Sequence, residues 1–220
     1  MKKIVISIGG SLIDPKELDL HFLKNLKTVL RKHRRNKKII LVTGGGHLAR
    51  EYMQPVIGEK EKNTIGIACT KLHALLLSHI LGLKKNIPVS IKELQRRLKN
   101  ENILVCGGLH LNAPMTSDGT AAEIAKHIHA EYFMNMTNVK GLYTKDPKKW
   151  RNAKRIKKMS LKEFYSLAKK HHEKPGQHFV LDIHAAKVCK ESEIPILIFT
   201  GTKNLQNILC NKSWEGTFIS

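Results

Sequence analysis

The chain has 220 residues, of which 39 are Lys or Arg and 18 are Asp or Glu, so its formal net charge is +21. A chain of this length can fold as one domain, or as two closely packed lobes, without disulfides or metal ions. Its four cysteines lie far apart, with no CxxC pair and no Cys/His cluster at ligand spacing, which argues against a disulfide framework or zinc site and predicts a reduced, cytoplasmic setting.

The basic residues are concentrated in three runs, residues 31–38, 145–158 and 169–174. Such runs can hold a polyanion. These three carry almost no aromatic side chains for stacking on bases, and they match no nucleic-acid-binding module. We therefore expect a solvated basic surface and no nucleic-acid partner.

The first residues predict a strand rather than a targeting segment. Residues 2–13 begin with lysines and continue with an apolar run, but Gly9 and Gly10 interrupt that run and no small-residue cleavage site follows. No apolar segment in the sequence approaches the roughly 20 residues needed to span a bilayer. We expect no membrane segment.

The first fifty residues alternate between strands and helices. A strand over residues 2–8 leads to a glycine turn at 9–11, and the next helix is predicted to begin with Asp14 as its N-cap. A second strand over 37–43 and a second glycine turn at 44–46 precede another helix. This βαβα order predicts a mostly parallel sheet between helices.

The rest of the chain continues the alternation. The later predicted elements are, in chain order, a helix over 65–83, a strand over 103–106, a helix over 118–131, an apolar strand from 132 to 136, a helix after the capping pattern Ser160 to Glu163, a helix over 182–192 and a strand over 195–200. Together they predict an α/β fold, with a mostly parallel sheet sandwiched between helices, in a single domain, 1–220. A soft boundary near residue 125 divides the predicted domain into two lobes.

Three glycine turns follow three of the apolar strands, at residues 9–11, 44–46 and 107–108. Ligands collect at the carboxyl ends of strands in an open α/β sheet, and a glycine turn that opens a helix lets backbone N–H groups approach a phosphate. None of the turns matches GxxxxGK[ST] or GxGxxG, so neither a P-loop nor a Rossmann fingerprint is present. Three such turns favour an anionic ligand over tight strand–helix packing alone.

A polar stretch follows the strand over 132–136. It offers a hydroxyl, an amide, an aromatic ring and a carboxylate in Thr137, Asn138, Tyr143 and Asp146. Taken alone, such a stretch is most often only a turn. Beside an anion site, it has the groups needed to bind the base and ribose of a nucleoside.

Five segments, in this order, carry a family resemblance: IGGSLI, VTGGGHLAREYM, TSDGTAAEIA, TNVKGLYTKDP and LDIHAAK. They resemble the motifs of the amino-acid kinase superfamily and are most similar to the archaeal type of uridylate (UMP) kinase. The resemblance covers essentially the whole chain. It implies the amino-acid kinase (carbamate kinase-like) fold, with an acceptor side over about 1–125 and an ATP side over about 126–220. Isopentenyl phosphate kinase is a weaker match because its GAGSFGH-like segment is missing.

The resemblance also implies roles for individual residues. Those expected at ATP are Gly10, Ser11, Gly46, Arg50, Thr137, Asn138, Tyr143 and Asp146. Those expected at UMP are Gly45, Asn63, Gly108, Thr116, Ser117 and Asp118. Arg50 and Asp182 are the expected catalytic residues, and Lys187 is expected to contact phosphate. No protein ligand to a metal is implied, because Mg²⁺ is expected to be held mainly by the phosphates.

The sequence departs from the family pattern at three places. Ser7 occupies a position where relatives often have a lysine, and Asn63 aligns with an aspartate that meets the UMP ribose in relatives. The loop between Gly108 and Thr116 is about two residues longer than usual, so individual uracil contacts cannot be carried over. The histidines His47 and His110 lie near the expected site, and we interpret both as ordinary polar residues.

The expected reaction is therefore ATP + UMP to ADP + UDP, in pyrimidine nucleotide biosynthesis. Relatives form hexamers built as trimers of dimers, so a homo-oligomer is expected. Two alternatives remain open on the sequence. One is a kinase of another small phosphate or carboxylate acceptor, and the other is a non-catalytic nucleotide-binding regulator, which Ser7 and the charge of +21 favour.

Overall fold

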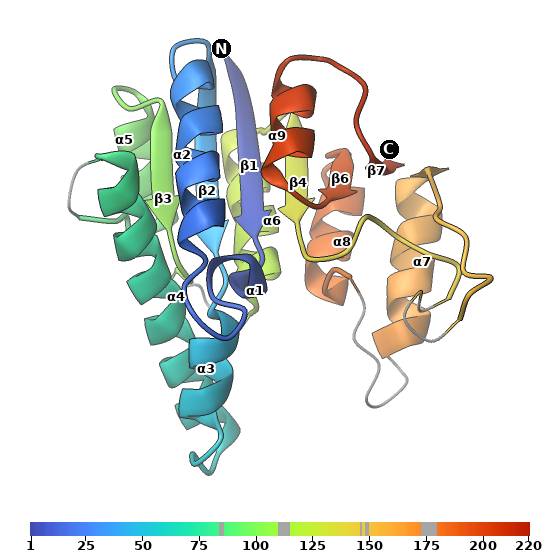
Figure 1. Ribbon diagram of the computed structural model, residues 1–220, viewed down its shortest axis with the longest axis horizontal. Coiled ribbons are helices and arrows are strands. Elements are labelled where there is room, and N and C mark those ends of the chain that lie inside the picture. The colour runs from blue at the N-terminus through green and yellow to red at the C-terminus, as the bar shows by residue number, and fades with distance from the viewer. Residues whose placement is uncertain (84–85, 110–114, 146, 148–149, 173–179) are drawn as a thin grey trace.

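The protein forms a three-layer structure with one sheet between two layers of helices (Figure 1). This computed structural model describes residues 1–83, 86–109, 115–145, 147, 150–172 and 180–220. The sheet has seven strands in the order β3-β2-β1-β4-β6-β7-β5. They are β1 (Lys2–Ile8), β2 (Lys37–Thr43), β3 (Ile103–Cys106), β4 (Tyr132–Met136), β5 (Lys158–Met159), β6 (Ile196–Phe199) and β7 (Gly216–Ile219). Only the β6–β7 pair is antiparallel, which confirms the predicted mostly parallel α/β fold.

Helices cover both faces of the sheet. The face turned to the viewer in Figure 1 packs against α2 (Leu20–His33), α4 (Glu59–Leu81) and α9 (Thr202–Leu209). The opposite face packs against α5 (Ile91–Leu98), α6 (Ser117–Ile128), α7 (Leu161–His172) and α8 (Ile183–Glu191). Two short helices, α1 (Gly10–Ile13) and α3 (Gly46–Met53), begin where β1 and β2 end.

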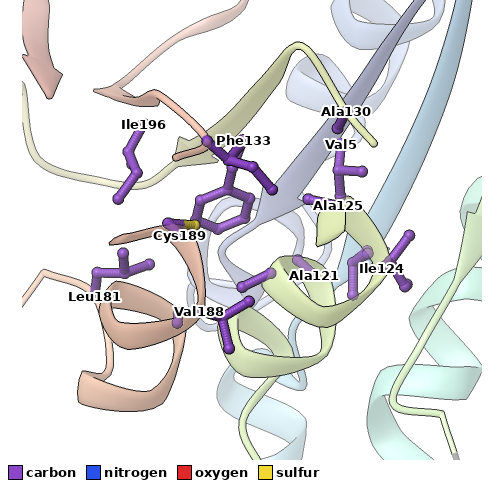
Figure 2. Close-up of a cluster of buried hydrophobic side chains, with 14 of the residues drawn as sticks. Val5, Ala121, Ile124, Ala125, Ala130, Phe133, Leu181, Val188, Cys189 and Ile196 are labelled. Atoms are coloured by element: carbon purple, nitrogen blue, oxygen red, sulfur yellow. The ribbon is translucent and has the colours of Figure 1, made fainter. Parts of the chain in front are cut away.

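The core consists of two clusters, one on each face of the sheet. Successive residues of a strand point to opposite faces, so Val5 joins the cluster under α6 and α8 while Ile4 and Ile6 join the other. In Figure 2, the fully buried ring of Phe133 lies between α6 and α8, against small side chains such as Ala121. Small residues let both helices approach the sheet closely and fix where their first turns lie.

Several predicted helix boundaries are wrong. The helix predicted to begin with Asp14 as its N-cap is α2, which begins at Leu20, because Asp19 accepts a hydrogen bond from the Phe22 amide at 2.8 Å and is the actual N-cap. The helix predicted over 65–83 begins six residues earlier, at Glu59, and ends at Leu81. The helix predicted to reach residue 131 ends at Ile128, where the next residue takes a left-handed conformation with φ 52°.

Five elements were not predicted: α1, α5, α9, β5 and β7. A signal for α5 was present in the spacing of Ser90 and Glu93, since the Ser90 hydroxyl accepts from the Glu93 amide at 3.2 Å and the Glu93 carboxylate accepts from the Val89 amide at 3.1 Å. The analogous pair that was predicted, Ser160 and Glu163, is confirmed at the start of α7. The strands β5 and β7 have two and four residues, too short for a periodic pattern.

The 23-residue helix α4 corrects the expectation that no apolar segment is long enough for a bilayer. Within the described residues it is the one helix that meets a length and composition test for spanning, which core helices of soluble proteins also pass. It packs against α3, β3 and α2. Two leucines on it, Leu72 and Leu75, remain exposed.

Candidate functional site

The first two glycine turns meet at the carboxyl edge of the sheet. A Cβ on Gly44 would lie 2.6 Å from the amide nitrogen of Gly10, and a Cβ on Gly10 would lie 2.6 Å from the Cα of Gly46. Such distances are too short for any side chain, so both turns must be glycine for the backbones to touch. Gly46 itself has φ 65°, a left-handed conformation that favours glycine.

This contact leaves backbone donors available. Within the described residues, the N–H groups of Gly10, Gly45 and Gly46 have no hydrogen-bond partner. They lie at the starts of α1 and α3, and the first N–H groups of a helix carry a partial positive charge. The two turns thus form a surface of backbone N–H donors suited to an anion such as phosphate. We call this surface, made by Gly10, Gly45 and Gly46, the glycine floor.

Asp14 holds the start of α3 in place. Its carboxylate accepts from the Leu48 amide at 2.7 Å, and its carbonyl oxygen accepts from the His47 amide at 3.0 Å. Sequence analysis assigned Asp14 to the wrong helix, because its actual partner lies 34 residues away and no local pattern reports it. A further unpredicted support is His73, whose buried Nδ1 lies 2.8 Å from the carbonyl oxygen of Gly44.

Two of the predicted acceptor residues, Asn63 and Gly108, lie on or beside α4. Asn63, Ile67 and Thr70 share one face of this helix by their spacing. Thr70 accepts from the Gly108 amide at 2.7 Å, and a Cβ on Gly108 would touch Ile67 at 3.3 Å. The third glycine turn therefore lies on the helix face that carries Asn63. The adjoining loop over 110–114, with His110, lies outside the described residues.

Thr116 and Asp182 join the first turns of α6 and α8. The Thr116 hydroxyl donates to Asp182 and accepts from the Gly119 amide at 3.1 Å, so it caps α6. Asp182 also accepts from the Ala185 amide at 2.7 Å and caps α8, as predicted. The structure thus brings together two residues, 66 positions apart, that sequence analysis assigned to UMP binding and to catalysis.

Asp118, in the first turn of α6, is a partly buried carboxyl group that lies beside the end of β1. The Ser7 hydroxyl donates to it at 2.6 Å, and Ser7 is fully buried. Burial raises the pKa of Asp118, the Ser7 hydrogen bond lowers it and the nearby Asp182 raises it, which together bring it to about 7. At neutral pH the carboxyl therefore exchanges between its protonated and ionised forms, whereas a lysine at position 7 would favour ionisation.

The predicted ATP residues divide into two groups. Thr137 adjoins the first glycine turn, since a Cβ on Gly9 would lie 3.7 Å from its Cα, and Asn138 follows it. Tyr143 lies farther along, in an isolated bridge to Arg155 beside β7. Asp146 lies outside the described residues.

The charged residues expected at phosphate lie on helices near this edge. Arg50 is exposed and follows Gly46 by one turn on α3, so the two share a helix face. Lys187 is exposed on α8, where its Nζ lies 3.9 Å from Glu191. Within the described part of the chain, no group of three His, Cys, Asp or Glu residues could hold a metal ion.

Comparison with known proteins agrees with this arrangement. The sequence model of the amino acid kinase family matches residues 2–200. A uridylate kinase from Methanoregula boonei is 33% identical, with 100% of this chain and 96% of that protein aligned, and one from Archaeoglobus fulgidus is 34% identical over 91% of each. The crystal structure of uridylate kinase from Archaeoglobus fulgidus has a TM-score of 0.86 at 30% identity and covers 100% of both chains.

Replacing Gly10 with Ala tests the contact between the glycine turns. The added methyl group would press on the backbone of Gly46, and strain of this kind typically costs about 1–3 kcal/mol of unfolding free energy. Chemical denaturation should show that loss. Gly66→Ala is the matched control, because a Cβ there meets only the sulfur of Met53 at 3.3 Å and Ala favours a helix by up to about 1 kcal/mol. Equal stability of the two variants would contradict the proposed crowding.

The raised pKa of Asp118 predicts a pH-dependent stability. Between the ordinary value of 3.8 and about 7, the carboxyl ionises in the unfolded chain but stays protonated in the folded one. The unfolding free energy should therefore fall as pH rises through this window, by up to about 1.4 kcal/mol per pH unit from this group. Asp118→Asn should remove that component, measured as the difference between the two denaturation profiles. A difference that stays constant from pH 4 to pH 7 would contradict the assignment.

Proposed function

The chain belongs to the amino acid kinase family, and from this premise we propose that it transfers the γ-phosphoryl group of ATP to UMP, giving ADP and UDP. The observation that carries the proposal is the full-length likeness to uridylate kinases, in sequence and in structure. The glycine floor by itself would suit many anions. Its position at the strand ends supports a reaction between two phosphorylated molecules.

We assign the two substrates to the two parts of the chain. UMP is proposed to lie over residues 1–125, against Gly45, Asn63 and Gly108, with Thr116, Ser117 and Asp118 at the start of α6. ATP is proposed to lie toward residues 126–220, with its phosphates over Gly10, Ser11 and Gly46. Its adenosine would meet Thr137, Asn138, Tyr143 and Asp146. Support comes from the floor where Gly10 and Gly46 meet, which lies between the two sets.

The proposed chemistry requires alignment and charge neutralisation. A UMP phosphate oxygen is already a nucleophile, so no general base is needed. The N–H groups of Gly10, Gly45 and Gly46 stabilise charge on the phosphoryl oxygens, and Arg50 adds a cation one turn along α3. Asp182 is proposed as the catalytic carboxylate that keeps the starts of α6 and α8 in register.

Magnesium is proposed to be bound mainly by the substrate phosphates. Bound there, Mg²⁺ would neutralise charge that builds up on the transferred phosphoryl group. This fits the described residues, which offer no cluster of three metal ligands, since Mg²⁺ commonly keeps several waters and is held by phosphates with one or two carboxylates.

Ser7 in place of lysine does not remove the proposed activity. Its hydroxyl satisfies the partly buried Asp118, so the site is intact without the lysine. Arg50 and Lys145 lie in motifs of their own, and Mg²⁺ would add two further charges. Losing one preorganised donor costs on the order of 10²–10³ in rate, which the remaining cations offset in part.

The proposed setting is cytoplasmic pyrimidine nucleotide biosynthesis. A homo-oligomer, a hexamer built as a trimer of dimers, is part of the proposal. The exposed Leu72 and Leu75 on α4 are the contact we propose within a dimer, because burying such side chains is favourable. No membrane partner is proposed.

An acceptor panel tests the reaction. ADP release is measured with UMP, CMP, AMP, GMP, isopentenyl phosphate, glutamate and carbamate at one ATP concentration. UMP should give the highest kcat/KM. If isopentenyl phosphate or carbamate is turned over as fast as UMP or faster, UMP is not the preferred acceptor. Binding of ATP and UMP without turnover of any acceptor would favour the non-catalytic regulator.

Arg50→Ala should lower kcat/KM for ATP by about 10²-fold, since it removes a cation from the transferred phosphoryl group. Arg50 is exposed, so the unfolding free energy should change little. Arg34→Ala is the matched control, because it removes an equal charge from an exposed position at the end of α2. Similar kinetic losses in the two variants would show that Arg50 acts only through the general charge of the protein.

A further inference from the structure

A hollow of about 560 Å³ lies on the sheet face that carries α9, at the edge of the sheet away from the glycine turns. The helical layer on this face ends at α9, so β7 and β5 extend beyond it (Figure 1). Tyr132 at the start of β4 and Lys212 just after α9 both line the hollow. Its volume is within the range of small-molecule sites.

The hollow contains aromatic side chains drawn from distant parts of the sequence. Tyr132, Trp214 and Phe218 line it, and each is only partly buried. Trp214 is held in place, since its ring packs edge-on against Phe199 at 6.2 Å between centroids, and a Cβ on Gly216 would lie 2.9 Å from its Cε3. A fixed, partly exposed indole is a surface on which a base can stack.

The rim of the hollow is cationic. Lys157, Lys158 and Lys212 line it, are exposed and form no ion pair within the described part of the chain. Lys158 pairs with Phe218 in the sheet, which places the end of a basic run beside an aromatic ring. A fourth cation, Arg155, is neutralised by Glu215 at 2.5 Å. Three positive charges thus remain for a ligand.

From this combination we infer a second nucleotide-binding site, separate from the glycine floor, that takes a nucleoside polyphosphate. The base stacks on Trp214, and the phosphates meet Lys157, Lys158 and Lys212. Sequence analysis rejected a nucleic-acid partner for the basic runs because they carry almost no aromatic residues. The fold supplies those residues from β4, β7 and the segment after α9.

The charges and the shape argue against other occupants. A second copy of this chain would bring the same three lysines to the interface, and like charges repel at close range. A single-stranded nucleic acid would require a row of stacking positions along a groove. The hollow instead offers one concave site of small-molecule size.

Fluorescence of Trp214 tests this inference. The chain has two tryptophans, so Trp150→Phe leaves Trp214 as the only one. Titration with UTP should change the Trp214 emission in a saturable way with one site per chain. Uridine, which lacks phosphate, and inorganic triphosphate, which lacks a base, should each bind at least about tenfold more weakly.

Two triple variants in the Trp150→Phe background separate site-specific from general charge effects. Lys157→Ala with Lys158→Ala and Lys212→Ala should raise the Kd for UTP at least about tenfold. Lys24→Ala with Lys32→Ala and Lys99→Ala removes the same charge from exposed positions elsewhere and should leave the Kd within about twofold. Arg50→Ala should leave the Trp214 titration unchanged, so this result is independent of whether the kinase reaction occurs.

Four outcomes would overturn the inference. They are the absence of a saturable Trp214 signal, equal weakening in the two triple variants, binding of a single-stranded RNA that UTP does not displace, and a Trp214 change that follows protein concentration together with a larger sedimentation coefficient. The third result would indicate a nucleic-acid groove. The last would indicate an interface between copies.

Discussion

The backbone contact between Gly10 and Gly46 is the constraint on which the rest of the structure depends. Two strands that lie side by side end in turns that touch, and only glycine allows that approach. The contact places the starts of α1 and α3 against each other, with backbone donors of both facing no partner in the described chain. Asp14 and His73 then fix α3 and the second turn from the sides. The phosphate site that we propose is thus built from main chain, and its geometry is set by sheet register rather than by flexible side chains.

A second group of contacts extends this edge across the sheet. Small residues of α6 and α8 pack closely around Phe133, so the first turns of both helices reach the same place. There Thr116 and Asp182 tie them together, and Asp118 enters the interior to meet Ser7. Burying a carboxyl group costs free energy unless it is protonated or paired, and Ser7 supplies a hydrogen bond in place of a charge. The catalysis that we propose and the folding stability therefore depend on the same group of residues.

Much of this arrangement could be predicted from the sequence, and the exceptions have physical causes. Strands 2–8, 37–43 and 103–106 were predictable because both their faces are buried and they read as continuous apolar runs. The role of Asp14 could not be predicted, because its carboxylate accepts from the amide of Leu48, 34 residues away, and such a contact leaves no local pattern in the sequence. Short strands such as β7 depend on their neighbour for stability and carry little signal. The hollow beside Trp214 also needed the fold, because its rings and lysines come from separated segments.

The most direct test of the central claim is to follow backbone amides while both substrates bind. In a ¹⁵N spectrum of the protein, a non-hydrolysable ATP analogue added together with UMP should shift the amide signals of Gly10, Gly45 and Gly46, because these N–H groups would receive phosphate oxygens. The Gly108 amide should respond to UMP alone. Saturation of both ligands with no shift at the first three glycines, and with changes confined to other parts of the chain, would contradict the account.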